Sequence, residues 1–200
     1  MAVGVFELLK QEFAKANQTG DLKNVPRHSA AAAAWYADFI KNNITKMNAL
    51  EGLRSGKRDN KISPGSFYVY SYDPKTKETL PFYDTMPLIL CTSVTPNGHY
   101  GIAFHYLPPK IRLKIIQEMY KVSKMTSNDN MKFRLSWAKA QQLVHAIGQD
   151  KWLKHSIKQY LHSHVKSDMI KVAGDNIEPM LFLPIARWKK ATQTEVWRAA

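Results

Sequence analysis

Lysines recur at helical spacing in two stretches of the sequence, and a row of ammonium groups is suited to binding a polyanion. At 3.6 residues per turn, the lysines of the segment 109–124 fall within about 80° of one another on a helix. They are Lys110, Lys114, Lys121 and Lys124. A predicted helix over 150–166 places a second set on one face: Lys151, Lys154, His155, Lys158, His162 and Lys166. Each lysine can act as a point charge on a phosphate, and binding gains from released counterions.

The alternative interpretation of both stripes is a solvated helix face, which is the usual position of helical lysines. The scarcity of balancing acids favours binding, because Asp150 is the only acidic residue between 150 and 166. Asp150 also stands at the predicted start of that helix, where a carboxylate stabilises the helix dipole. The pattern therefore predicts a polyanion as partner without saying which one.

A third group of cations lies near the end of the chain, and here the cations are next to aromatic residues. Arg187, Trp188, Lys189 and Lys190 are consecutive, and Trp197 precedes another arginine. A tryptophan can stack on an unpaired base or on a DNA end while neighbouring cations hold phosphates. The alternative is that both tryptophans seal the edge of the core. We include these residues among the candidate DNA contacts and keep both interpretations open.

Catalytic chemistry finds little support in the sequence. There is no HExxH motif, no H-x-E motif with a partnered CxxC, and no glycine-rich phosphate loop. Asp84 and His105 could be brought together by the fold, but a lone pair of this kind is more often structural. Cys91 lies in an apolar stretch, where a thiol is expected to be inert. We predict a protein that is not an enzyme, with no catalytic residues, no metal site and no cofactor.

The overall charge agrees with a polyanionic partner. The 200 residues hold 29 Lys and Arg against 16 Asp and Glu, which gives a net charge of +13. Such a surplus creates a positive surface potential that speeds encounters with anions. Nucleic acid is the commonest anionic partner, ahead of anionic membranes and acidic proteins. Hydrophobic residues make up 44% of the chain, enough to bury a core and to exclude a disordered basic tail.

The redox and targeting features predict a protein that stays in the cell that makes it. The single cysteine cannot form an internal disulfide, and cysteine ligands are too few for a zinc site. The first residues, MAVGVFELLKQEF, lack the basic region of a signal peptide. The longest uncharged stretch, 85–109, is broken by prolines and is not expected to span or bind a membrane.

The elements that must position these residues form an α+β pattern. Helices are expected over 3–16 and after Ser29, which can cap the alanine-rich segment that follows. The centre is β: we expect strands over 67–72 and 88–94, and a Pro96-Asn97-Gly98 turn leading into YGIAFH. Pro109 can open a helix. Further helices are predicted over 109–124, 136–147 and 150–166, and β-like segments over 168–172 and 180–183.

These elements predict a small curved antiparallel sheet or an SH3-like barrel, flanked by basic amphipathic helices and preceded by an N-terminal helical appendage. We divide the chain into a helical segment 1–50, a basic linker 51–65 and an α+β core domain 66–200. That domain ends in a basic tail over 185–200.

Two stretches of the sequence resemble a known family. FYVYSYDPKTKETLPFYDTMPLIL, followed by YGIAFHYLPPKIR, and the closing LFLPIARWKKATQTEVWRAA are similar to proteins of large contractile-tailed bacteriophages of the T-even type. Within that group the chain resembles the DNA end protectors, minor virion proteins that cap the packaged linear genome. The resemblance covers about 60–120 and 150–200, and leaves the N-terminal helices up to Asn60 outside.

The resemblance implies a protein that is made in the host cytoplasm and carried in the virion, with double-stranded DNA ends and other virion proteins as partners. It supplies no catalytic residues. The alternative is a structural component of the tail, baseplate or neck that works through protein–protein contacts. In that case the basic stripes would face an acidic neighbour or the DNA channel.

Overall fold

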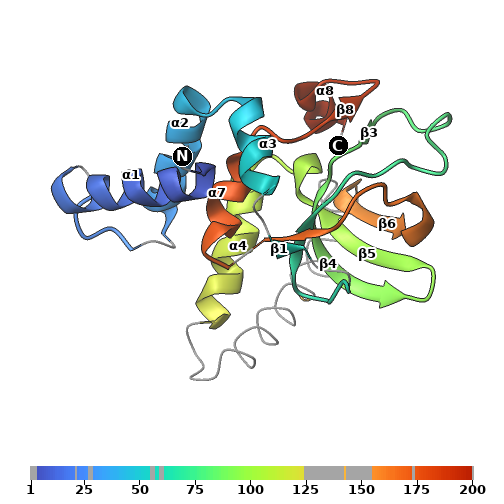
Figure 1. Ribbon diagram of the computed structural model, residues 1–200, viewed down its shortest axis with the longest axis horizontal. Helices are drawn as coiled ribbons and strands as arrows, with labels where there is room; N and C mark the ends of the chain where they lie inside the picture. The colour runs from blue at the N-terminus through green and yellow to red at the C-terminus, as the bar shows by residue number, and fades with distance from the viewer. Residues whose placement is uncertain are drawn as a thin grey trace.

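A computed structural model describes residues 4–20, 22–26, 29–54, 57–58, 61–123, 142, 155–172 and 174–199. Most helices occupy one side of the molecule and an antiparallel sheet the other, and the end of the chain lies at the top on the side of the sheet (Figure 1). The predicted α+β class is confirmed. The sheet is open, so the curved sheet is the correct alternative and the closed barrel is not.

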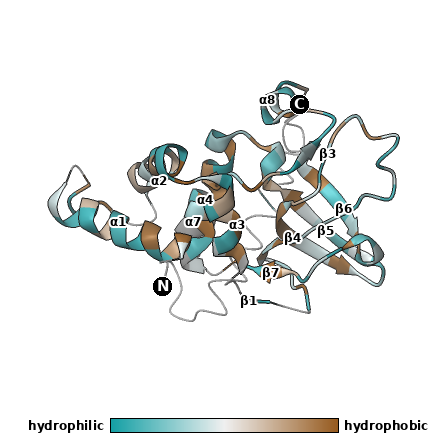
Figure 2. Cartoon of the chain, turned by 45° about the horizontal axis from the view of Figure 1, so that its top comes forward, coloured by the Kyte–Doolittle hydropathy of each residue, from teal (hydrophilic) through white to brown (hydrophobic). Residues whose placement is uncertain are grey.

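Three helices form the N-terminal part: α1 (Val5–Thr19), α2 (Ala30–Asn43) and α3 (Lys46–Arg54). Ser29 caps α2 as predicted, because its side chain accepts a hydrogen bond from the amide of Ala32. α1 and α3 approach closely at Gly52, where a Cβ atom would lie 1.9 Å from the Val5 side chain. Apolar side chains of all three helices belong to the same buried cluster as the sheet, and hydrophobic segments accordingly turn inward in Figure 2.

The main sheet has the order β1-β7-β2-β4-β5-β6, and every neighbouring pair is antiparallel. Its strands are β1 (Lys57–Arg58), β2 (Phe67–Val69), β4 (Leu88–Thr95), β5 (Gly98–Ala103), β6 (Ile157–Leu161) and β7 (Ile170–Lys171). A second sheet pairs β3 (Tyr83–Asp84) with β8 (Trp188–Lys189). The predicted turn over 96–98 joins β4 to β5 as a hairpin.

Alternate residues of the central strands enter two different buried clusters. Phe67, Val69 and Leu90 face the helices and join the main core. Tyr68 and Ile89 face the other way, into a tyrosine-rich cluster that also contains Tyr70, Tyr72, Cys91 and Tyr160. The sheet is therefore buried on both faces, and the second face is largely aromatic.

The predicted helix over 150–166 is wrong from residue 157 onward. Residues 157–161 form β6, which pairs with the edge of β5, and a short 3₁₀ turn η2 (His162–His164) follows. Gly98 permits this pairing, since a Cβ atom there would lie 2.1 Å from the carbonyl oxygen of Tyr160. Pairing with an open strand edge outweighs the high helix propensity of Lys, Gln and Leu.

Of two further predictions, the helix that begins at Pro109 is confirmed and the β-like segment 180–183 is wrong. Pro109 opens α4 (Pro109–Ser123) after the 3₁₀ turn η1 (Phe104–Tyr106). The β-like segment 180–183 lies instead mostly in α7 (Ile177–Phe182), preceded by η3 (Gly174–Asn176), because its apolar side chains pack onto α2 and α4. The chain ends in α8 (Gln193–Ala199). None of the helices in the described segments is long and apolar enough to cross a membrane.

Candidate nucleic-acid interface

The lysine stripe of α4 is partly visible in the structure. Lys110 and Lys114 are exposed on α4, whereas the opposite side of the helix packs into the core through Ile115 and Ile116. Lys121 also belongs to α4, although its side chain lies outside the described residues. Lys124, Lys151 and Lys154 lie outside the described residues too.

One cation of α4 has a structural role that its sequence position did not reveal. Arg112 is buried, and its guanidinium donates hydrogen bonds to the carbonyl oxygens of Leu107, Leu181 and His105. Burial lowers the pKa of Arg112 to about 9, against the opposing charge of Asp84, so the group stays charged at neutral pH. Arg112 therefore ties α4 to η1 and α7.

Lys158 does not lie on a helix face as predicted. It lies on β6, is partly buried, and its Nζ stands 4.6 Å from the ring centroid of Tyr106. This is a cation–π contact. Burial lowers the pKa of Lys158. The predicted grouping of Lys158 with His155, His162 and Lys166 on one helix face is wrong, because the backbone there is a strand and a 3₁₀ turn.

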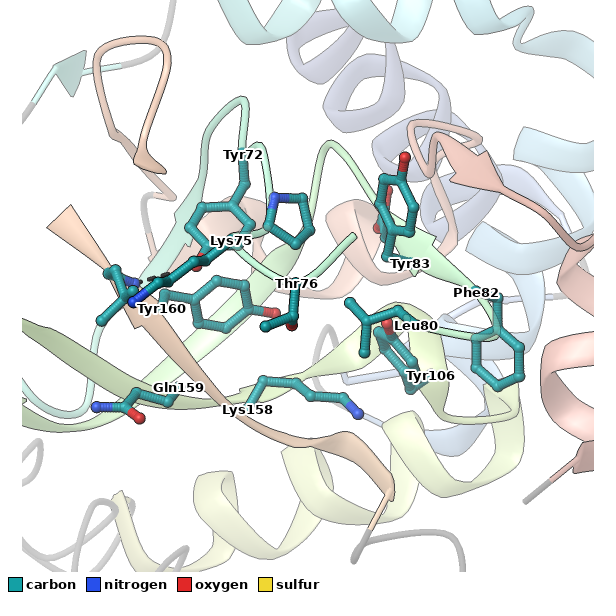
Figure 3. Close-up of a pocket in the computed structure, with 13 residues that line it drawn as sticks. Tyr72, Lys75, Thr76, Leu80, Phe82, Tyr83, Tyr106, Lys158, Gln159 and Tyr160 are labelled. Carbon is teal, nitrogen blue, oxygen red and sulfur yellow. Dashed lines mark hydrogen bonds between the residues drawn. The ribbon is translucent and has the colours of Figure 1, made fainter. Parts of the chain in front are cut away.

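Lys158 enters a cavity of about 280 Å³ on the aromatic side of the sheet, which we call the lysine–tyrosine cavity (Figure 3). One wall is β6, with Lys158 and Tyr160, and another is Tyr106 of η1. The loop 73–82 and strand β3 close the remaining side with Lys75, Leu80, Phe82 and Tyr83, among others. In Figure 3 the Lys158 side chain extends beneath Thr76 towards Tyr106.

The loop that closes this cavity is held by the C-terminal segment. The Nζ atom of Lys190 donates hydrogen bonds to the carbonyl oxygens of Lys77, Glu78 and Leu80, at 2.8 to 3.1 Å. Lys77 in turn pairs with Asp73 at 3.0 Å. Lys190 was predicted to contact DNA, but in the structure its ammonium group is occupied by backbone carbonyls.

Asp84 and His105 do meet, as their sequence environment suggested. The carboxylate of Asp84 lies 2.5 Å from Nδ1 of His105, and both residues are buried. The second carboxylate oxygen accepts hydrogen bonds from the amides of Met86 and Arg187. Burial alone would raise the pKa of Asp84, but the charge and hydrogen bond of His105 and these amides outweigh it and lower the pKa. The pair joins β3, η1 and the start of β8.

The two C-terminal tryptophans are partly buried, and each is held in place by a hydrogen bond of its indole N–H group. Trp188 donates its indole N–H to the Gln193 side chain, and Trp197 donates to the carbonyl oxygen of His105. The Arg112 guanidinium lies 5.6 Å from the ring centroid of Trp197. Both rings contribute to a small cluster with Tyr106 and Val196. This packing fits the alternative in which the tryptophans close the edge of the core.

The same two tryptophans also line a groove, of about 660 Å³, which we call the tryptophan groove. Its other walls come from α2, the start of α3, α4, and the end of α7 with the segment that follows it; Lys41, Lys46, Pro109 and Phe182 are among the lining residues. Lys46 reaches across to the carbonyl oxygen of Ala186 at 3.3 Å. Arg187 and Lys189, on either side of Trp188, are exposed. The structure thus brings predicted tryptophans and cations to one region.

Two further titratable groups on the sheet, His99 and Cys91, are buried and neutral at pH 7. His99 stacks on Tyr160, and its Nε2 is hydrogen-bonded to the Tyr70 hydroxyl at 2.7 Å. Burial, with a smaller contribution from His162, lowers the pKa of His99 to about 4. Burial raises the pKa of Cys91 to about 11, which keeps the thiol protonated and agrees with an inert residue. Among the described residues, no group of three His, Cys, Asp or Glu could hold a metal ion.

Comparison with known families places the chain among phage proteins that protect DNA ends. Residues 11–199 match the family model of the phage T4 terminal DNA protecting protein, and the chain belongs to this family. The predicted resemblance is confirmed. The match begins at residue 11, so the prediction that the N-terminal helices lie outside the resemblance is wrong. Comparisons with curated proteins and with solved structures gave no match.

Proposed function

We propose that this protein binds the ends of linear duplex DNA in the phage particle and shields them, without catalysing a reaction. The observation that carries the proposal is the family match over residues 11–199 together with the tryptophan groove. A free duplex end differs from continuous duplex in exposing the face of a base pair. A preformed aromatic groove flanked by cations offers a complementary surface for that face.

In the proposed complex, the terminal base pair stacks against the rings of Trp188 and Trp197. Their N–H groups are already satisfied within the protein, so the rings are held in place and little ordering is needed on binding. Arg187 and Lys189 are exposed beside Trp188 and would hold the adjacent phosphates. Lys41 and Lys46 on the facing wall would hold phosphates of the other strand.

The exposed lysines Lys110 and Lys114 would add contacts that do not depend on sequence, farther along the duplex. Lys121, Lys124, Lys151 and Lys154 belong to the same proposed set of phosphate contacts. Such contacts increase affinity through counterion release and leave recognition of the end to the aromatic groove. We further propose that the protein is made in the host cytoplasm, is packaged in the virion and contacts other virion proteins there.

Exonuclease digestion tests this function. A linear fragment saturated with the protein should be degraded much more slowly from its ends than the free fragment. Endonuclease cleavage at an internal site of the same fragment should keep its rate, which separates end capping from general coating of the DNA. Digestion from the ends at the free rate would overturn the proposal and would favour a structural virion role through protein–protein contacts.

A further inference from the structure

The lysine–tyrosine cavity is distinct from the tryptophan groove, and its chemistry is that of a ligand site. We propose that it binds a single unpaired nucleotide at the end of a DNA strand, with Lys158 on the phosphate and the surrounding aromatic rings on the base or sugar. This inference rests on the proposed DNA-end function and deepens it, because it assigns a second contact to the terminus.

The first argument is the charge of Lys158. Its ammonium group is partly buried and, within the described part of the chain, makes no hydrogen bond or ion pair; its one polar contact is the ring of Tyr106. Among the described residues, Asp84 is the one acidic residue that lines the cavity, and its carboxylate already accepts hydrogen bonds from His105, Met86 and Arg187. A partly desolvated cation without a counterion is costly, and an anionic ligand would offset that cost.

The second argument is the lining around that charge. Tyr72, Tyr106 and Phe82 supply aromatic rings, and the hydroxyl of Tyr160 makes no hydrogen bond within the described segments. In Figure 3 the Tyr160 hydroxyl points towards Thr76, inside the ring of lining residues. Lys75 is exposed on the loop and adds a second cation. Rings, hydroxyls and cations together match a nucleotide better than they match a simple anion.

The third argument is size and rigidity. A volume of about 280 Å³ is near the lower limit of sites for small organic ligands, about 300 Å³, and suits one nucleotide better than a base pair. The loop that closes the cavity is fastened by the three hydrogen bonds of Lys190 and by the Lys77–Asp73 pair. The cavity is therefore preformed, which lowers the entropic cost of binding.

The fourth argument is position. Tyr106 lines the lysine–tyrosine cavity and Trp188 lines the tryptophan groove, and their ring centroids are only 4.8 Å apart. A DNA end held at the groove therefore lies beside the cavity. Fraying of the last pair costs a few kcal/mol at most, and a terminal nucleotide that leaves the stack can enter a neighbouring pocket. The two sites would then act on the same terminus.

The test is titration of the full chain with thymidine 5′-monophosphate, with thymidine and with inorganic phosphate, followed by calorimetry or by NMR. We expect the monophosphate to bind at least about tenfold more tightly than thymidine or phosphate alone, since a charge-assisted hydrogen bond is added to stacking. Lys158→Met should reduce that affinity about tenfold or more, and Tyr160→Phe, which retains the ring, several-fold. Lys23→Gln, an exposed lysine outside the cavity, is the matched control and should bind as the wild type does.

Equal affinity for all three probes, or unchanged monophosphate binding in Lys158→Met, would overturn the inference. Tighter binding of 5′-phosphorylated than of 5′-hydroxyl oligonucleotides would assign the phosphate to the strand terminus, and equal binding of the two would overturn that assignment. The two proposals fail differently: a protein that prefers DNA ends but ignores the monophosphate contradicts only the cavity. A protein without preference for ends contradicts the function itself.

Discussion

Tyr106 and Trp188 pack edge to face, with 4.8 Å between ring centroids and planes inclined at 77°. Each ring lines a different hollow, the lysine–tyrosine cavity and the tryptophan groove, respectively. The pair is therefore the wall between them. His105, the residue before Tyr106, stabilises this pair. Its ring is hydrogen-bonded to the Asp84 carboxylate, and its carbonyl oxygen accepts a hydrogen bond from the Trp197 indole. Perturbing this support should affect the whole C-terminal side of the molecule.

Asp84→Asn should destabilise the protein by about 1–3 kcal/mol, because it replaces a buried carboxylate that accepts hydrogen bonds from His105 and from two backbone amides. The measurement is chemical or thermal unfolding, with the exposed Asp38→Asn as control, which should unfold like the wild type. We expect no metal-dependent DNA cleavage by the wild type. Cleavage that disappears in Asp84→Asn would show that the pair is catalytic.

Because the pKa of Asp84 is lowered in the fold, the contribution of Asp84 to the free energy of unfolding depends on pH. The unfolded state takes up a proton near pH 3.8, whereas the folded state does so only at lower pH. The stabilisation is thus complete above about pH 4 and is lost as the pH falls through the folded pKa. The stability difference between the wild type and Asp84→Asn should shrink in acid, and a constant difference would contradict this account.

His99 should make the protein less stable in mild acid. Its pKa is about 4 in the fold against 6.5 when unfolded, so the unfolded state binds more protons between these values. Stability should fall by up to about 3 kcal/mol as the pH drops from 6.5 to 4, at about 1.4 kcal/mol per unit. An NMR titration of the His99 ring with a midpoint between 6 and 7 would refute the assignment.

Lys158→Met should leave the melting temperature of the free protein unchanged or raise it at neutral pH. The lowered pKa of Lys158 means that its charged form is disfavoured by folding, so wild-type stability should rise with pH between the folded pKa and 10.5. Methionine keeps the apolar stem against Tyr106 and removes the charge. A melting temperature lower by several degrees would show that Lys158 is needed for folding and not held for a ligand.

Replacing Lys110, Lys114 and Lys121 together by Gln should weaken DNA binding and flatten its salt dependence. In a plot of the logarithm of the binding constant against the logarithm of the salt concentration, the negative slope should become shallower by about 0.9 for each phosphate contact removed. Stability should stay nearly constant, because Lys110 and Lys114 are exposed. If the triple variant binds with the wild-type slope, this face of α4 is not part of the site.

Local signals in the sequence predicted much of the fold. Ser29, the 96–98 turn and Pro109 each begin an element where expected, because their backbone preferences act within a few residues. β6 could not be predicted in this way, since it exists only by pairing with β5, far away in the chain. α7 was missed for a different reason: a short apolar run is as compatible with a buried helix as with a strand.

The candidate site was predicted only in part. The sequence pointed to Trp188 and Trp197, and both line one groove. The roles of Arg112 and Lys190 were not visible, because their partners are backbone carbonyls from distant segments. The lysine–tyrosine cavity also had no local signature, since Lys158, Tyr106 and the 73–82 loop meet only in three dimensions.

The central claim is preference for a DNA end, and competition binding measures it directly. Equal masses of linear and closed-circular DNA of the same sequence would compete for protein bound to a short labelled linear fragment. Stacking on an aromatic ring contributes about 1–3 kcal/mol per base, so an end should be favoured over an internal site by about one to two powers of ten. The linear competitor should therefore displace the fragment at a much lower concentration, and more so when the same mass is cut into more pieces. Equal competition by the circle would contradict the account.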